Sequence, residues 1–162
     1  MAGLARFNLK GHGALVTGGT KGIGLAIVRE LAELGASVVT CARNLDAGAA
    51  AGLPEGVHTI QADVSVRADR ERLMQSASGL LEAAGRPLSI LVNNAGTNIR
   101  KPTVEYSEAE FATVMTTNFE SAYHLSQLAH PLLKAASPSV AAVGGSSIVM
   151  VSPAGASATC RP

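Results

Sequence analysis

The most constraining feature of this sequence is a glycine-rich segment, residues 15–24, which reads Leu-Val-Thr-Gly-Gly-Thr-Lys-Gly-Ile-Gly. A short apolar run enters it, and a helical pattern of apolar residues leaves it, with Gly35 placed to cap the helix. A strand, a glycine turn and a helix in this order open a dinucleotide-binding βαβ unit. Its glycines let the backbone approach a pyrophosphate at the helix N-terminus. The alternative is a plain tight turn, which uses glycine only to reach positive φ.

Four further apolar runs predict strands, at residues 37–42, 57–62, 88–92 and 148–151. Helical patterns alternate with these runs, so the strands should be parallel and joined by crossovers. The sequence therefore predicts an α/β protein with a Rossmann-type doubly wound parallel sheet. We expect this sheet to be incomplete, with about five strands and without the C-terminal strands. Residues 1–152 should form an NADP-binding Rossmann domain, and residues 153–162 an irregular tail.

Local signals predict where the helices begin and end. Ser65 is a good N-cap for a helix that stops at Gly85, and Ser107 with Glu110 forms a capping box before a long helix. Pro131 should break or kink that long helix. Segments 45–56 and 137–145 are rich in small residues, and we expect a short helix with a loop in the first and a loop in the second.

Composition excludes several classes of function. The chain has 162 residues, 47% of them hydrophobic, and a net charge of +1, which suits one packed domain and argues against a nucleic-acid or membrane-surface partner. Two cysteines do not form a disulfide framework, so a reduced, cytoplasmic compartment is expected. We expect no signal peptide and no membrane span. The four histidines lack metal-ligand spacing, so no metal site is predicted.

The carboxyl ends of the five predicted strands carry the candidate site residues. Ligands in open parallel sheets bind beyond these ends. The residues at the ends are Gly18, Arg43, Asp63, Asn94 and Ser152.

Cofactor preference is indicated by the residue after the second strand. An acidic side chain there would bond the ribose 2′-hydroxyl of NAD, whereas an arginine accommodates the 2′-phosphate of NADP. This sequence has Arg43, with Lys21 in the glycine turn as a second cation, so NADP is the predicted cofactor. The alternative is that both are ordinary solvated surface cations.

The sequence resembles the short-chain dehydrogenase/reductase family. Its glycines at 18, 22 and 24 follow the family spacing T-G-x-x-x-G-x-G, and Asn-Asn-Ala-Gly at 93–96 and Thr-Asn-Phe at 117–119 match further family motifs. Segments 94–102 and 118–125 resemble plant tropinone reductase-like members, and the likeness runs from about Phe7 to Ser152.

The resemblance implies NADPH-dependent reduction of a small-molecule ketone to an alcohol by hydride transfer. It implies that these residues bind the cofactor: Gly18, Thr20, Lys21, Gly22, Ile23, Gly24, Arg43, Asp63, Val64, Asn94, Ala95 and Gly96. It also implies catalytic roles for Asn118, which would hold a water in a proton relay, and for Ser152. Two alternatives stay open from the residues alone: Asp63 as a helix or turn residue, and Asn118 as the partner of a backbone carbonyl.

The sequence departs from the family pattern at its C-terminal end. The family's Tyr-x-x-x-Lys pair is absent, because Tyr106 is followed four residues later by Glu110 and Tyr123 by Gln127. Either Ser152 or Pro153 occupies the place of the catalytic serine. We therefore expect a C-terminally truncated reductase whose fifth strand has an uncovered edge. The alternatives are a catalytically inactive NADP-binding module and a non-functional truncation product. Homo-oligomerisation and association with a full-length relative both stay open.

Overall fold

The protein folds around one parallel sheet. The computed structural model describes residues 8–45, 52–140 and 145–152. Within them the sheet has five strands in the order β3-β2-β1-β4-β5, all parallel. The strands are β1 (Gly13–Thr17), β2 (Ser37–Ala42), β3 (His58–Gln61), β4 (Leu88–Asn93) and β5 (Ser147–Met150). The predicted α/β class and parallel sheet are confirmed.

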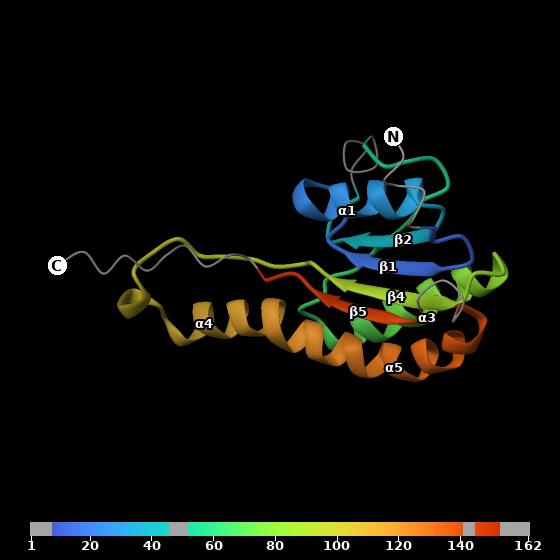
Figure 1. Ribbon diagram of the computed structural model, residues 1–162. Coiled ribbons are helices and arrows are strands. Elements are labelled where there is room, and N and C mark those ends of the chain that lie inside the picture. The colour runs from blue at the N-terminus through green and yellow to red at the C-terminus, as the bar shows by residue number, and fades with distance from the viewer. Residues whose placement is uncertain (1–7, 46–51, 141–144, 153–162) are drawn as a thin grey trace.

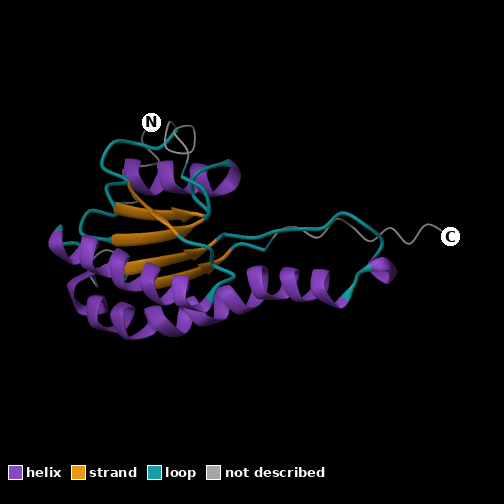
Figure 2. Ribbon diagram, turned by 180° about the vertical axis from the view of Figure 1, so that it is seen from behind, coloured by secondary structure: helices purple, strands orange, loops and turns teal. Residues whose placement is uncertain are grey.

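Helices cover both faces of the sheet, as Figures 1 and 2 show. Helix α1 (Gly22–Glu33) lies on one face, and α3 (Arg67–Ala83) and α5 (Ser121–Val140) lie on the other. A short 3₁₀ turn, η2 (Thr103–Glu105), precedes α4 (Glu108–Met115), and a π-helical turn, η3 (Thr116–Glu120), joins α4 to α5. Helix α4 extends beyond the sheet (Figure 1). The order of strands reverses between β1 and β4, which is where such sheets bind ligands.

Two hydrophobic clusters form the core, one on each face of the sheet. Alternation along β1 separates them, since Leu15 points to one cluster and Ala14 and Val16 to the other. The strands β1 and β4 are buried along their whole length, which explains why their sequences are continuous apolar runs. The first cluster includes Val39, Leu73, Leu81, Leu91 and Leu125, and the second includes Val28, Val38, Ile90 and Val92.

Strand β5 lies at the edge of the sheet, beside β4. All four of its residues are exposed, whereas every residue of β4 is buried. The three apolar residues concerned are Ile148, Val149 and Met150. The expected uncovered edge is therefore present among the described residues.

Helix α3 does not begin as predicted. Its N-cap position is Val66, without a side-chain cap, so the prediction that Ser65 caps this helix is wrong. Instead the backbone N–H and the hydroxyl of Ser65 both donate to Asp63 Oδ1, at 2.9 and 2.7 Å. The ionised carboxylate two residues earlier is a strong acceptor, and it holds the N–H and hydroxyl of Ser65 in an Asx turn instead of at the helix N-terminus. The predicted capping box of Ser107 and Glu110 is present.

Helix α5 continues past Pro131, the residue expected to break or kink it. Pro131 lies inside the helix, which continues to Val140, so the loop predicted from residue 137 is wrong for residues 137–140. Burial of Leu133 and Ala136 against the sheet maintains the helix despite the hydrogen bond that proline removes. The short helix expected within 45–56 lies partly outside the described residues, and the tail 153–162 lies wholly outside them.

Within the described ranges, no helix combines the length and the apolar character needed to cross a bilayer. The same residues contain no group of three His, Cys, Asp or Glu side chains suited to holding a metal ion.

Candidate functional site

A cleft of about 760 Å³ lies at the carboxyl ends of β1 to β4. It contains all the residues that the sequence predicts to bind a cofactor. Its lining consists of Gly18, Thr20, Lys21, Gly22, Ile23, Gly24, Cys41, Ala42, Arg43, Asn44, Ala62, Asp63, Val64, Asn94, Ala95, Gly96, Thr97 and Thr117. Segments up to a hundred residues apart in sequence therefore meet at one edge of the sheet.

The turn after β1 needs glycine for two reasons: one position is too tightly packed for a Cβ, and others have a backbone with positive φ. Gly18 has φ +68°, and a Cβ at Gly24 would lie 2.3 Å from the Gly18 carbonyl oxygen. Gly22 has φ +56°, and a Cβ there would meet nothing within 4 Å. The turn is therefore packed tightly on its inner side and open toward the cleft, which is the shape that a backbone approach to a phosphate needs.

The N-terminal end of α1 borders this opening. Lys21 occupies the N-cap position without a side-chain cap, and the first turn carries no acidic residue. The first N–H groups of α1 therefore keep their capacity to bind an anion, and the helix dipole favours negative charge at this point. Ile23 is 67% exposed and lines the cleft instead of joining the core that its helical spacing indicates.

Asn94 connects the end of β4 to the glycine turn. Its Nδ2 donates to the carbonyl oxygens of Thr17 and Gly18, at 2.9 and 3.2 Å. The hydroxyl of Thr17 in turn accepts the backbone N–H groups of Asn94 and Ala95, at 3.0 and 2.9 Å. The amide group of Asn94 is thus used to hold the turn, and its backbone and that of Ala95 border the cleft.

Thr40 is a second support of the turn, and sequence reasoning missed both it and Thr17. Its hydroxyl accepts the N–H of Gly19 at 2.9 Å and donates to the carbonyl of Val16 at 2.7 Å. Both threonines are fully buried. A threonine inside an otherwise apolar strand was the available signal, because a buried hydroxyl needs a partner.

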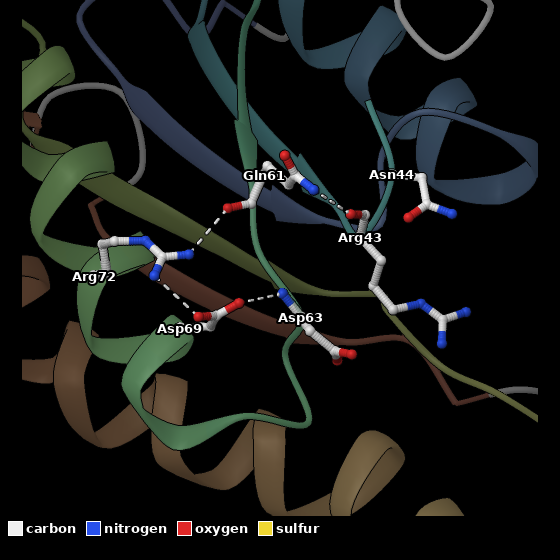
Figure 3. A pocket seen from close by; sticks show the side chains of 6 residues that line it. All are labelled: Arg43, Asn44, Gln61, Asp63, Asp69 and Arg72. Atoms are coloured by element: carbon white, nitrogen blue, oxygen red, sulfur yellow. Dashed lines mark hydrogen bonds and ion pairs between the residues drawn. The ribbon is translucent and has the colours of Figure 1, made fainter. Parts of the chain in front are cut away.

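Arg43 follows β2 at the other end of the cleft and borders a polar cavity of about 580 Å³ (Figure 3). Its backbone is fixed because Gln61 Nε2 donates to its carbonyl at 3.0 Å. Among the described residues its guanidinium forms no ion pair, whereas that of Arg72 pairs with Asp69 at 3.0 Å. The charge of Arg43 is therefore available to a ligand, as is that of exposed Lys21.

Ser65 and Arg43 keep the carboxyl group of Asp63 ionised. Burial raises the pKa of its carboxyl, but hydrogen bonds from Ser65 and the charge of Arg43 outweigh this, so its pKa lies below the usual range. Its backbone N–H also donates to Asp69 Oδ2 at 2.8 Å. Asp63 thus has the contacts of a turn residue, one of the alternatives left open, and it lines the cleft as well.

Asn118 makes the backbone contacts that the structural alternative predicted. Its Oδ1 accepts the N–H of Thr97 at 2.7 Å, and its Nδ2 donates to the carbonyl of Thr97 at 2.8 Å. It lies in η3, and its neighbours Thr97 and Thr117 line the cleft while it does not. Phe111, seven residues before Asn118, is exposed, because α4 extends past the sheet.

Ser152 lies just after β5, on the exposed side of the sheet edge, and is absent from the cleft lining. The residue before it, Val151, donates its N–H to the carbonyl of Asn93 at 2.9 Å. The catalytic roles of Ser152 and Asn118 stay predictions.

The doubly wound parallel sheet, with a glycine turn at its switch point, defines a Rossmann-type domain. The short chain dehydrogenase family matches residues 12–160, and the chain belongs to this family.

Relatives with about half of their residues identical come from Arabidopsis thaliana. A tropinone reductase homolog is 53% identical over 154 residues, which cover 91% of this chain and 54% of that protein. Senescence-associated protein 13 is 51% identical, over 93% of this chain and 54% of its own length. The chain therefore spans about half the length of these relatives.

Solved structures of bacterial proteins share the fold. The Pseudomonas aeruginosa RhlG/NADP active-site complex has a TM-score of 0.70 and 39% identity, over 82% of this chain and 52% of that one. The 3-ketoacyl-(acyl-carrier-protein) reductase from Brucella melitensis, complexed with NADH, has a TM-score of 0.71 and 28% identity, over 82% and 54% of the two chains.

Proposed function

We propose that this chain is the NADP-binding part of a cytoplasmic short-chain reductase that reduces a small-molecule ketone to an alcohol. The observation that carries the proposal is the cleft itself, where the glycine turn, the open N-terminus of α1 and two cations without an ion pair among the described residues face one space. Solved relatives include both an NADP complex and an NADH complex, so the choice between cofactors rests on Arg43 and Lys21.

The described residues fit such a cofactor. The backbone at Gly22 and Ile23 would hold the pyrophosphate, Asp63 and Val64 would contact the adenine, and Arg43 with Lys21 would bind the 2′-phosphate. NADPH, when bound, supplies the hydride for the reduction. The part of this chain is to bind and orient it.

Protonation of the ketone oxygen needs a positioned acid, and the 162 residues contain no Tyr-x-x-x-Lys pair. We therefore propose the ketone reduction for a protein that also contributes such a pair, and cofactor binding for the chain by itself. An NADP-binding module without catalytic activity is the second candidate, favoured by the missing pair.

Thermal unfolding of the 162-residue chain with NADPH and with NADH tests cofactor binding. A ligand at about 100 times its dissociation constant stabilises a folded binder by about 2.7 kcal/mol. Arg43→Ala should weaken NADPH about 10- to 100-fold and NADH far less, because a charge-assisted contact contributes about 1.5–3 kcal/mol. Lys134→Ala, which removes an exposed cation of α5, is the matched control and should change neither affinity. Equal losses for both cofactors with Arg43→Ala would contradict a 2′-phosphate contact, and no stabilisation by either cofactor would contradict the proposed function.

The outer face of the long helix supports a proposal about partners. Four apolar residues, each four positions from the next, are exposed along α4, η3 and α5, although a solvated helix face is normally polar. They are Phe111, Met115, Phe119 and Tyr123. We propose that this stripe joins two copies of the chain, or one copy to a full-length relative.

Sedimentation equilibrium of the Phe119→Ser variant tests this association. The variant should dissociate at least tenfold more readily than the wild type, because a central interface aromatic contributes about 2 kcal/mol. Val104→Ser removes an even more exposed apolar side chain outside the stripe and should not change the dissociation constant. A wild-type chain that stays monomeric at high concentration would contradict self-association.

A further inference from the structure

Arg70, in the first turn of α3, is a buried cation whose three bonds lead to both walls of the cleft. Only 1% of its surface is exposed. Its Nη1 donates to the carbonyl of Val64 at 2.9 Å, and its Nη2 pairs with Glu120 Oε1 at 2.7 Å. Val64 lines the cleft on the side of β3, and Glu120 ends the π-helical turn η3.

The π-helical turn supplies the opposite wall. Thr117 of η3 lines the cleft, and Asn118 holds Thr97, which lines it too, through two backbone hydrogen bonds. Arg70 therefore connects the carbonyl of Val64, which lines the cleft, to η3, whose Thr117 also lines it more than fifty residues later in the sequence. Side chains that lock the residues lining a site set how closely it matches its ligand.

The third bond of Arg70 depends on the protonation state of a histidine. Its Nε donates to His124 Nδ1 at 3.1 Å, so this nitrogen must carry a lone pair, and the ring proton lies on Nε2, 4.0 Å from Glu71. A protonated imidazole would present a second N–H to Arg70 and place a third positive charge beside Arg67 and Arg70.

The charged groups facing His124 are Arg67, Arg70 and Glu71 of α3 and Glu120 of η3. Burial lowers the pKa of His124 first, the two arginines lower it further, and the two glutamates oppose them in part, so the pKa lies below the usual histidine value. The ring is neutral at pH 7, and the network is intact there.

We propose that Arg70 is a positioning residue for the cofactor cleft, and that neutral His124 keeps it in place. Protonation of His124 releases Arg70 from the imidazole and loosens the contact between the Val64 wall and the η3 turn. Cofactor affinity then falls as the pH drops through the titration of His124. The predicted effect on cofactor affinity rests on the proposed function, whereas the predicted coupling between the two walls does not.

The coupling can be measured without cofactor by a two-dimensional NMR titration of the 162-residue chain. In the wild type the amide signals of Val64, Thr97 and Thr117 should shift with the same midpoint as the imidazole of His124. In His124→Asn, whose Oδ1 accepts from Arg70 but does not titrate, these shifts should be absent. Wall signals that do not follow His124 in the wild type would overturn the inference, whether or not any cofactor binds.

Affinity for NADP⁺ provides the second readout, measured from about pH 8 down through the His124 midpoint that the NMR titration gives. The 2′-phosphate of the ligand titrates near pH 6, so each variant is compared with the wild type at the same pH. At high pH His124→Asn should bind like the wild type, and Arg70→Lys, which keeps the charge but not the planar fork, should bind about tenfold more weakly. At low pH His124→Asn should bind about fivefold more tightly than the wild type.

Arg67→Gln is the matched control, because it removes an exposed arginine of the same helical turn. It should leave affinity unchanged at high pH. If the affinity of the wild type and that of His124→Asn fell by the same factor as the pH drops, the inference would be overturned. Absence of binding in the wild type would instead contradict the proposed function, and the NMR titration would still decide the coupling.

Discussion

At Gly24 the absence of one carbon atom allows the first turn of α1 to pack against the turn that precedes it. A Cβ there would lie 2.3 Å from the carbonyl oxygen of Gly18 and 2.4 Å from Asn94 Nδ2. Both atoms belong to the hydrogen-bonded support of the turn, so neither yields without breaking the contacts of Asn94. This residue shapes the cleft through packing and not through a contact with the ligand.

Gly24→Ala should lower the free energy of unfolding by about 1–3 kcal/mol, because an added methyl forces the backbone of the turn to move. Gly79→Ala is the control: this glycine is exposed to solvent in the middle of α3, and a Cβ there meets nothing within 4 Å. It should stabilise the protein by about 0.5–1 kcal/mol. Urea unfolding of both variants is the measurement, and two changes of the same sign would contradict the packing argument.

Among the α-helices of the described residues, α4 differs from α1, α3 and α5 in containing no buried residue. Its N-terminus is nevertheless fully capped: Ser107 Oγ accepts the N–H of Glu110 at 3.3 Å, and Glu110 Oε2 accepts the N–H of Ser107 at 2.8 Å. Local capping, more than tertiary packing, therefore holds this helix in place.

Ser107→Ala should cost the helix about 1 kcal/mol, and so raise hydrogen exchange of the α4 amides about fivefold. The midpoint of global thermal unfolding should stay unchanged, because α4 contributes little to the core. Ser107→Asn preserves an acceptor at the cap and should behave like the wild type. A lower global midpoint with unchanged α4 exchange would show that α4 is part of the cooperative unit.

At the scale of the whole molecule, the reactivity of the Cys41 thiol reports whether the domain is folded around it. It lies on β2, 1% exposed, and burial raises the pKa of its thiol from 9.0 to about 11. Because the folded state favours the neutral thiol, this group stabilises the fold below about pH 9, and that contribution is lost as the pH rises toward about 11.

Iodoacetamide should therefore label Cys41 slowly in the native protein at about pH 8 and rapidly in urea, since the thiolate is the reactive form. The Cys160→Ser variant makes Cys41 the only cysteine in the chain. Saturating NADPH should slow the native labelling further, because Cys41 borders the cleft. Equal rates in native buffer and in urea would show that the domain does not close.

The elements that sequence patterns predict well are those whose signals are local. Strand β2 begins and ends where its apolar run does, the helix of residues 22–33 is followed by Gly35 with φ +96°, and the capping box at Ser107 is present. Local signals were wrong where another group competed for the same contact, as Asp63 does for Ser65, or where packing kept α5 helical to Val140 through residues expected to form a loop.

By itself the sequence determined the order of strands and helices along the chain, the glycine turn and the residues gathered at one edge of the sheet. Periodicity, turn chemistry and motif spacing act within a few residues, and parallel topology then brings the strand ends together. Only the tertiary structure decided what those residues touch: the amide of Asn94 holds the turn, and Arg70 reaches His124, 54 positions away. Such contacts depend on how helices pack on the sheet, and no local pattern encodes that packing.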